Sequence, residues 1–480
     1  MPLLRLFIAV LIPTATGVLL ISALPGEDRG LTLEKLCLGY GLGTGVLTSL
    51  MFLQGILRVP FTLTAVTAPQ IVIIAALLCI LYRSGRIGRV FPRANGGLKE
   101  ALGRGAAFYI SLFLLTWVLL RVSFVFYECL TRPVYAVDAW GQWVSGAKFF
   151  FYEKGLSLDS ASPNYLGRWY RVDIGYPLHI SLVQAWGAIW LGGFHESFVK
   201  VWSAIYYAGM LGIFWSAVRR ESAPLYSLCW VFFLSGSPLL VYHGTEGLAD
   251  LPLGYYGLAS VLTFWRHIRE GSRAQLILSG AFAGLALLTK NEGLFLAAGL
   301  VLAFIISAVF RKNGLSTIAS FAVPFLAAVL PWLAFKAAVG LSIGHTGEEA
   351  GRSLISPEFI APLKGMLEAQ GQYNAGLHWE VLTEGLRQVF LKGANFNLII
   401  PFWAILSAAG IRTVLGTELK YIYLVILAVT AGFVFIYLTD IATIVTEGVA
   451  IHRNVLTYAP ILFFVSAALL ERLLQGEARR

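Results

Sequence analysis

Charged side chains are scarce in this sequence of 480 residues. Asp, Glu, Lys and Arg make up 13% of it, whereas 58% of the residues are hydrophobic. Soluble domains carry about 25% charged residues, so this shortage and the mean hydropathy of +0.74 indicate a membrane protein. The net charge of +10 does not indicate a nucleic-acid partner, because the basic residues stand in short loops between apolar runs. We therefore expect no binding to nucleic acid.

Cysteine and catalytic signatures are also lacking. The four cysteines are far apart in or beside apolar runs, and we interpret them as small buried hydrophobic residues. The chain has no Gly-rich phosphate loop, no HExxH and no GxSxG motif. These absences exclude a nucleotide-powered pump and a metalloprotease of the known patterns. We expect no definite cofactor, and the sequence does not indicate a divalent metal.

Long apolar runs fill most of the chain. Runs of ~16–23 residues are long enough to cross about 30 Å of hydrocarbon as helices. We therefore predict an all-α polytopic membrane protein of about 13 transmembrane helices, the first being retained rather than cleaved as a signal peptide. The predicted spans are 3–24, 34–54, 61–82, 105–126, 197–218, 223–242, 250–265, 275–290, 293–310, 316–338, 395–411, 419–438 and 454–471.

Basic loops orient these helices. The loop that ends in Arg104 is rich in Lys and Arg and holds a single acid, Glu100, so we place it in the cytoplasm. Further basic clusters fall on the same side, at Arg219–Arg220, Arg266 to Arg273, Arg311–Lys312, Arg412 to Lys420 and Arg479–Arg480. The charges near the N-terminus leave its side open. The prediction is a protein of the bacterial inner membrane whose active site faces outward.

This orientation divides the chain. We predict an N-terminal appendage of three helices with its basic loop (1–104), a catalytic core (105–471) and a cytoplasmic tail (472–480). Two long outer loops, 127–196 and 339–394, belong to the core. Within the first, the apolar stretch 179–193 is too short to cross, and we place it in the outer interface.

The first outer loop is the place where we expect chemistry. Trp140, Trp143, Ala147 and Phe151 share one face of a predicted amphipathic juxtamembrane helix over residues 139–152. Asp138 stands immediately before that helix. Its carboxylate could cap the helix by accepting backbone hydrogen bonds, or it could act as a general base toward an acceptor nucleophile. The two roles are compatible, and the sequence leaves both open.

Other polar clusters lie on the same side. Arg168 and Arg171, with aromatic neighbours, form either a solvated loop or a site for phosphate and a sugar ring. Glu246 and Asp250 stand at a helix junction, where acids favour the helix dipole but could also orient an acceptor or hold a divalent ion. We interpret His243 as an interface residue.

Two further motifs place charges close to the hydrocarbon. Lys290 and Glu292 occupy a tight turn between apolar helices, so they either pair with each other or meet a lipid phosphate. Arg453 precedes the last helix, where it either snorkels to the headgroups or forks around a phosphate.

The order of these motifs resembles the GT-C superfamily of membrane glycosyltransferases, near the bacterial relatives of protein O-mannosyltransferases and of the lipid A aminoarabinose transferase. The resemblance covers roughly residues 105–470. One departure is Asp138-Ala139, where many members carry Asp-Glu; the missing second acid argues against a metal in this loop. The motifs are Asp138 with Trp143 and Lys148, Tyr176-Pro177 before 179–193, Asp250-Leu251-Pro252, LTKNEG at 288–293, and Arg453 before Pro460.

The resemblance implies a transferase that moves a sugar from a polyprenyl-phosphate donor to a glycan, lipid or protein acceptor, with inversion. It implies that Asp138 is the catalytic base or orients the acceptor. With the clusters above, donor-phosphate binding is assigned to Arg453, Lys290, Arg168 and Arg171. Acceptor or sugar binding is assigned to Glu246, Asp250, Glu292, Trp140, Trp143, Lys148 and Tyr176.

Two other functions fit the hydropathy. A transporter or lipid flippase also combines many helices with a few embedded charges, but it predicts charges at mid-membrane and two related halves. The charges here gather on the outer side, and no internal symmetry is visible. A non-catalytic partner of an envelope synthase is the third alternative.

Overall fold

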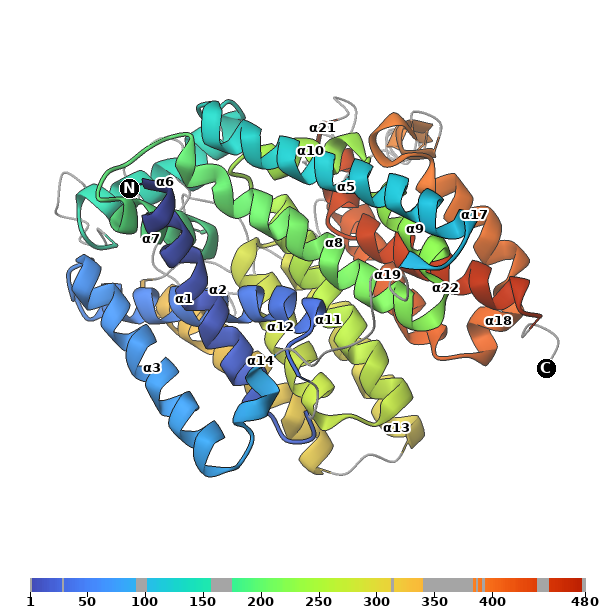
Figure 1. Ribbon diagram of the computed structural model, residues 1–480, viewed down its shortest axis with the longest axis horizontal. Helices are drawn as coiled ribbons and strands as arrows, with labels where there is room; N and C mark the ends of the chain where they lie inside the picture. The colour runs from blue at the N-terminus through green and yellow to red at the C-terminus, as the bar shows by residue number, and fades with distance from the viewer. Residues whose placement is uncertain are drawn as a thin grey trace, which may run out of the picture.

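The regular structure is helical throughout the part of the chain that is described (Figure 1). The computed structural model describes residues 2–27, 30–91, 102–156, 175–311, 315–339, 383–385, 387–390, 393–437 and 449–476. The predicted all-α class is confirmed. The helices are α1 (Pro2–Ala23), α2 (Leu33–Ile56), α3 (Leu63–Arg83), η1 (Ile87–Val90), α5 (Ala106–Thr131), η2 (Ala139–Trp143), α6 (Val144–Tyr152), α7 (His179–Leu191), η4 (Phe198–Lys200), α8 (Val201–Glu221), α9 (Pro224–Ser235), α10 (Pro238–Thr245), α11 (Asp250–Glu270), α12 (Arg273–Thr289), α13 (Gly293–Arg311), α14 (Leu315–Val339), η6 (Gly393–Phe396), α17 (Ile399–Ala409), α18 (Ile411–Gly416), α19 (Leu419–Tyr437), α21 (Val449–Leu456) and α22 (Ala459–Leu474).

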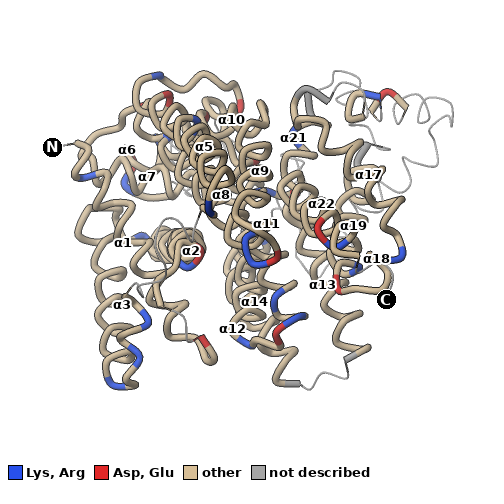
Figure 2. Tube along the Cα trace, turned by 45° about the vertical axis from the view of Figure 1, so that its right-hand side comes forward, with Lys and Arg blue, Asp and Glu red and all other residues tan. Residues whose placement is uncertain are grey.

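Seven of the described helices are long and apolar enough to cross a membrane. They begin at Pro2, Leu33, Leu63, Ala106, Phe198, Gly293 and Ser316. The pair α9 and α10 makes an eighth span if it is counted as one helix bent by 65°. Figure 2 shows long stretches of helix without charges and several basic residues around the end of α3. The chain is an integral membrane protein, and the predicted number of about 13 spans stays a prediction.

The break between α9 and α10 has a local cause. Pro238 stands in the first turn of α10 and cannot donate the hydrogen bond that would continue α9. At the end of α9, Arg121 of α5 donates to the carbonyl oxygen of Phe232 at 2.6 Å and to the Ser235 hydroxyl at 3.1 Å. The predicted span 223–242 is therefore two short helices, and the bend directs α10 toward α21 (Figure 1).

The stretch predicted to lie in the outer interface forms α7, which is surrounded by protein. Nearly all of its side chains are buried, against α6, α1 and α2. Trp186 donates to the Ala9 carbonyl oxygen at 2.8 Å, and Arg5 donates to that of Leu191 at 3.1 Å. The helix itself agrees with the prediction, but its apolar side chains are covered by neighbouring helices.

The first two helices are in close contact with the later ones. The Tyr256 hydroxyl donates to the Gly41 carbonyl oxygen at 3.0 Å, and the Thr44 hydroxyl lies 3.1 Å from that of Tyr206. Thr48 is within 2.6 Å of His179 Nδ1. A buried hydroxyl network thus joins α2 to α7, α8 and α11. The division into an appendage and a core at residue 104 stays a prediction.

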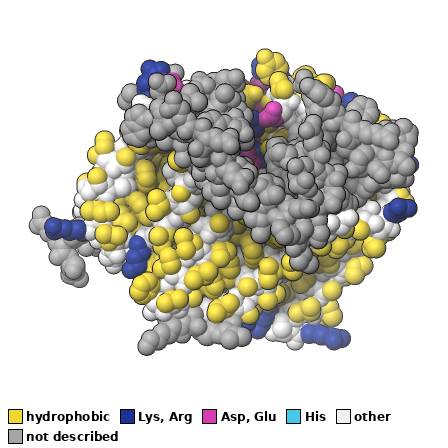
Figure 3. All heavy atoms as spheres, turned by 180° about the vertical axis from the view of Figure 1, so that it is seen from behind, with side chains coloured by type: hydrophobic (Ala, Val, Ile, Leu, Met, Phe, Trp, Pro, Cys, Tyr) yellow, Lys and Arg dark blue, Asp and Glu magenta, His cyan; other side chains and the backbone are white. Residues whose placement is uncertain are grey.

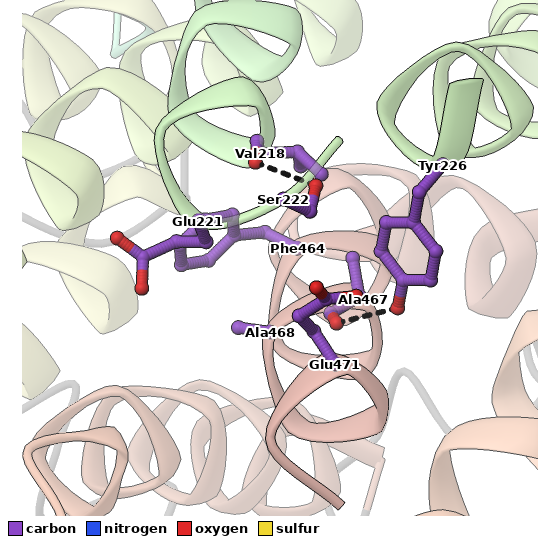
Figure 4. Close-up of a pocket in the computed structure, with 8 residues that line it drawn as sticks. All are labelled: Val218, Glu221, Ser222, Tyr226, Phe464, Ala467, Ala468 and Glu471. Atoms are coloured by element: carbon purple, nitrogen blue, oxygen red, sulfur yellow. Dashed lines mark hydrogen bonds between the residues drawn. The ribbon is translucent and has the colours of Figure 1, made fainter. Parts of the chain in front are cut away.

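Helix α11 connects two polar regions. Its 21 residues span about 30 Å, so Asp250 and Glu270 lie at opposite faces of the bundle. At the far end, Arg266 pairs with Glu34 and Arg269 pairs with Glu221. The hollow in Figure 4, lined by Glu221, Ser222, Tyr226 and Glu471 among others, belongs to that end. Between the two ends, hydrophobic side chains cover a broad outer face (Figure 3).

Candidate active site

Four segments that are distant in the sequence meet at one cluster of charges. Arg453 of α21 donates through Nη1 to Asp138 Oδ2 and through Nη2 to Asp250 Oδ2, the latter at 3.0 Å. Lys290 Nζ lies 3.0 Å from Asp250 Oδ1 and 2.6 Å from Glu292 Oε1. Acids and bases therefore alternate along a chain of five side chains, from Asp138 to Glu292. We call these five residues the charge chain.

Asp250 is the centre of the charge chain. It is the first residue of α11, where the helix dipole favours a carboxylate, and its side chain is 0% exposed. A buried carboxylate is costly unless it is paired and hydrogen-bonded. Lys290 and Arg453 meet that requirement, one at each carboxylate oxygen.

Asp138 is held differently. Its carboxylate makes no capping hydrogen bond to the helix that follows, and its partner is Arg453. The capping alternative is therefore wrong. The side chain is 49% exposed, so one acid of the charge chain is accessible while Asp250 is not.

The helix after Asp138 is present, but Trp140 does not lie on the predicted face with Trp143 and Ala147, which are buried. Residues Ala139–Trp143 form a π-helical turn, whose i→i+5 hydrogen bonds shift the register of the side chains. Trp140 is consequently 54% exposed, whereas Trp143 is 2% exposed. Trp143 packs edge-on against Tyr176, with ring centroids 5.3 Å apart. Trp140 is thus the one of these three aromatic residues whose side chain is exposed.

The remaining predicted residues fall into three groups. Lys148 is half exposed and pairs with Glu196 at 3.8 Å, with Phe194 beneath its ammonium group. Arg168 and Arg171 lie outside the described residues. Glu246 is buried and accepts hydrogen bonds from the backbone amides of Tyr135 and Ala136, at 3.2 and 3.3 Å.

Sequence reasoning interpreted His243 wrongly as an interface residue, and it missed Lys200. His243 is buried, and its Nδ1 lies 3.7 Å from Asp250 Oδ2, because the bend before α10 turns it inward. Lys200 is buried beside Glu246, at 3.9 Å. Its isolated place at the start of an apolar run looks like that of a snorkelling lysine, so no local signal distinguishes it.

Electrostatics keep both cations of the charge chain protonated. The Asp250 carboxylate raises the pKa of Arg453 above its ordinary value; burial opposes this effect, and Asp138 adds to it. Burial lowers the pKa of Lys290, but Asp250 and Glu292 together outweigh burial, and the net shift is upward. Arg453 Nε is buried and has no hydrogen-bond partner among the described residues, so one donor of this guanidinium is unsatisfied there.

No three His, Cys, Asp or Glu side chains come together as a metal site among the described residues. Arg453 contacts the exposed Asp138, and Lys290 shares Asp250 with Arg453; guanidinium and ammonium groups both bind phosphate.

Residues 177–335 match the family model described as dolichyl-phosphate-mannose-protein mannosyltransferase. The resemblance to the GT-C membrane glycosyltransferases is confirmed. The matched range holds Asp250, Lys290 and Glu292, and it ends before Arg453. At the level of class, the match supports a glycosyltransferase that is an integral membrane protein.

The chain also resembles one solved structure, whereas no curated protein matches it significantly. The chain is similar to the crystal structure of ArnT from Cupriavidus metallidurans in the apo state, with a TM-score of 0.39 and 16% identity, over 77% of this chain and 78% of that chain. A search of curated protein sequences gave no significant match.

Proposed function

We propose that this protein transfers a sugar from a polyprenyl-phosphate donor to an acceptor on the extracytoplasmic face, in a single displacement with inversion. The observation that carries the proposal is the fork of Arg453, which holds the exposed Asp138 and the buried Asp250 together. Asp138, the base proposed for the acceptor, thus contacts Arg453, and Arg453 shares Asp250 with Lys290, the second cation proposed for the leaving phosphate.

The displacement exchanges one bond for another. The acceptor oxygen attacks the anomeric carbon of the sugar, and the bond from that carbon to the phosphate oxygen breaks with its electron pair going to the phosphate. Asp138 takes the proton of the acceptor. Arg453 and Lys290 stabilise the charge that develops on the phosphate, Arg453 through its unpaired Nε and Lys290 through its ammonium group.

Donor binding and base activation are coupled in this arrangement. Without a ligand, Asp138 is engaged in an ion pair with Arg453. A phosphate oxygen that takes over Nη1 of Arg453 releases the Asp138 carboxylate, which is then free to accept a proton. The base thus becomes available when a donor is present.

Glu292 and Trp140 are the residues that we propose for the sugar and the acceptor. One carboxylate oxygen of Glu292 binds Lys290, and the other is buried and accepts no hydrogen bond from the described part of the chain, as a hydroxyl-binding acceptor would be. The exposed ring of Trp140 offers an apolar surface two residues from Asp138. Trp143 is buried and packs edge-on against Tyr176, so we assign these two residues to holding the turn that carries Trp140.

The test is donor turnover by the purified protein in nanodiscs. A panel of radiolabelled polyprenyl-phosphate hexoses and pentoses is supplied with a membrane extract as acceptor, and label that leaves the lipid is counted. We expect Asp138→Asn to lower kcat by at least about 100-fold, the usual range for loss of a general base. The matched control is Glu153→Gln, an exposed acid beyond α6, which should retain wild-type turnover.

Two results would contradict the proposal. Wild-type kcat in Asp138→Asn would remove the base from its role. Uptake of the labelled lipid into proteoliposomes without release of sugar would identify a transporter instead.

A further inference from the structure

A buried ion pair outside the charge chain contacts the segment that precedes Asp138. Lys200 of η4 and Glu246, which follows α10, are 3.9 Å apart, and both side chains are almost fully buried. Neither belongs to the charge chain. Their contacts are directed at the backbone of residues 133–136, the segment that joins α5 to the helix of Asp138.

Each polar group of this pair holds a backbone group of that segment. Lys200 Nζ donates to the Pro133 carbonyl oxygen at 3.0 Å. One carboxylate oxygen of Glu246 accepts from the amides of Tyr135 and Ala136. Three hydrogen bonds from these two side chains therefore fix the backbone of residues 133–136. This segment is not helical, and it ends two residues before Asp138.

The pair is costly to bury, so its retention calls for a reason. Replacing a buried ion pair by hydrophobic residues of similar size is often neutral or stabilising. Stability alone therefore gives a weak account of Lys200 and Glu246. Ala136 is buried and Val134 is partly buried against the core, but Tyr135 is 83% exposed, so packing of the Tyr135 side chain does not hold the backbone at that position.

We propose that Lys200 and Glu246 are positioning residues that set the Asp138 carboxylate against Arg453. The proposal rests on the function proposed for Asp138 and reassigns Glu246, for which the sequence suggested contact with the acceptor. Glu246 and Asp250 both stand at the junction between α10 and α11, and each would then help to fix the ion pair between Asp138 and Arg453. Asp250 accepts directly from Nη2 of Arg453. Glu246 holds the backbone that leads to Asp138, which accepts from Nη1.

The test compares two double variants that remove both charges and so leave no unpaired buried ion. Lys200→Met with Glu246→Leu removes every hydrogen bond of the pair, whereas Lys200→Met with Glu246→Gln retains an acceptor oxygen for the amides. We expect the Leu variant to lose kcat by about 100-fold with KM for the lipid donor within twofold, since a displacement of about 1 Å has that effect on rate. The Gln variant should recover at least tenfold of this loss.

Hydrogen–deuterium exchange measures the geometry without a donor. The amides of Tyr135 and Ala136 should exchange slowly in the wild type, fast in the Leu variant and at intermediate rates in the Gln variant. The control is Lys35→Met with Glu27→Leu, a buried pair at the opposite end of α11, which should leave kcat and these two amides unchanged.

The outcomes separate the two proposals. Unchanged exchange at Tyr135 and Ala136 in the Leu variant would overturn the positioning role, and so would a wild-type kcat. A lower kcat that appears equally in the control variant would show a general loss of folding and would also overturn it. If the wild-type protein releases no sugar in the turnover assay, the function proposed for Asp138 is overturned instead. That result does not depend on hydrogen–deuterium exchange at Tyr135 and Ala136.

Discussion

At the scale of single residues, exposure separates the two aspartates that share Arg453. Asp250 is fully buried between two cations, so its loss would leave Arg453 and Lys290 without their common partner. Asp138 is half exposed, and its loss removes a solvent-accessible ion pair, which is worth little to stability. Substitution of Asp250 should therefore affect folding, and substitution of Asp138 should affect turnover.

The sign of the pKa shift at Lys290 gives a prediction about alkaline pH. Because the pKa is raised in the folded protein, the stabilisation by Lys290 is fully present below its unfolded value of about 10.4 and is lost as the pH rises through the folded value. Lys290→Met should lower the free energy of unfolding by about 3–5 kcal/mol, as expected for one half of a buried pair. The deficit should stay constant from pH 7 to about 10 and shrink above that.

Thermal unfolding in detergent across this pH range measures the deficit, with Lys290→Arg as the variant that keeps the charge. A deficit that already shrinks between pH 7 and 9 would mean that burial outweighs the two carboxylates, and the assigned direction would be wrong.

At the scale of elements, glycines decide how closely α1 and α2 approach. A Cβ on Gly43 would overlap the Pro13 carbonyl oxygen, and one on Gly17 would overlap that of Gly39. Small residues allow such contact between helices in a membrane, where the hydrophobic effect does not drive helices together. The close packing of α1 places α2 where Tyr255 and Tyr256 of α11 donate to its backbone.

Gly43→Ala should therefore separate α1 from α2. The expected loss in the free energy of unfolding is about 1–3 kcal/mol, the usual effect of overpacking. Gly416→Ala is the matched control, because a Cβ there meets no atom within 4 Å. Thermal unfolding in detergent compares the two, and equal midpoints would show that α1 adjusts to the added methyl group without loss.

At the scale of the whole molecule, a cluster of ion pairs lies at each end of α11. The charge chain and the Lys200–Glu246 pair lie at its start. Near its end, Arg220 and Arg266 pair with Glu34, and Arg269 with Glu221. The basic loops predicted to be cytoplasmic adjoin this second region. The proposed orientation thus puts the whole thickness of the bundle between the site and the cytoplasm.

Thiol labelling tests this orientation. We expect Tyr135→Cys to react with a membrane-impermeant maleimide in intact spheroplasts, and Gln475→Cys to react only after permeabilisation. Both positions are exposed, and Cys79→Ser with Cys229→Ser reduces the background from the two cysteines that are not buried. Labelling of Gln475→Cys in intact spheroplasts would reverse the assigned sides.

Hydropathy and charge, which are properties of the linear chain, determined the membrane class, most helix positions and the four motifs of the candidate site. Asp138, Asp250, Lys290 and Arg453 were identified because charges beside hydrocarbon are costly and therefore stand out. Their pairing could not be predicted, because Asp138 and Arg453 are 315 residues apart and local periodicity carries no information about such contacts.

Tertiary structure alone decided which way each side chain points. Trp140 and Trp143 look equivalent in a helical pattern, and a π-helical turn separates them. Glu246 looks like a second acid for the acceptor, yet the segment before Asp138 folds over it and takes up its carboxylate. His243 lies beside Asp250 because α10 is bent, and Lys200 of η4 binds the backbone of the segment before Asp138. The physical reason is the same in each case: burial and pairing depend on neighbours that are distant in the chain.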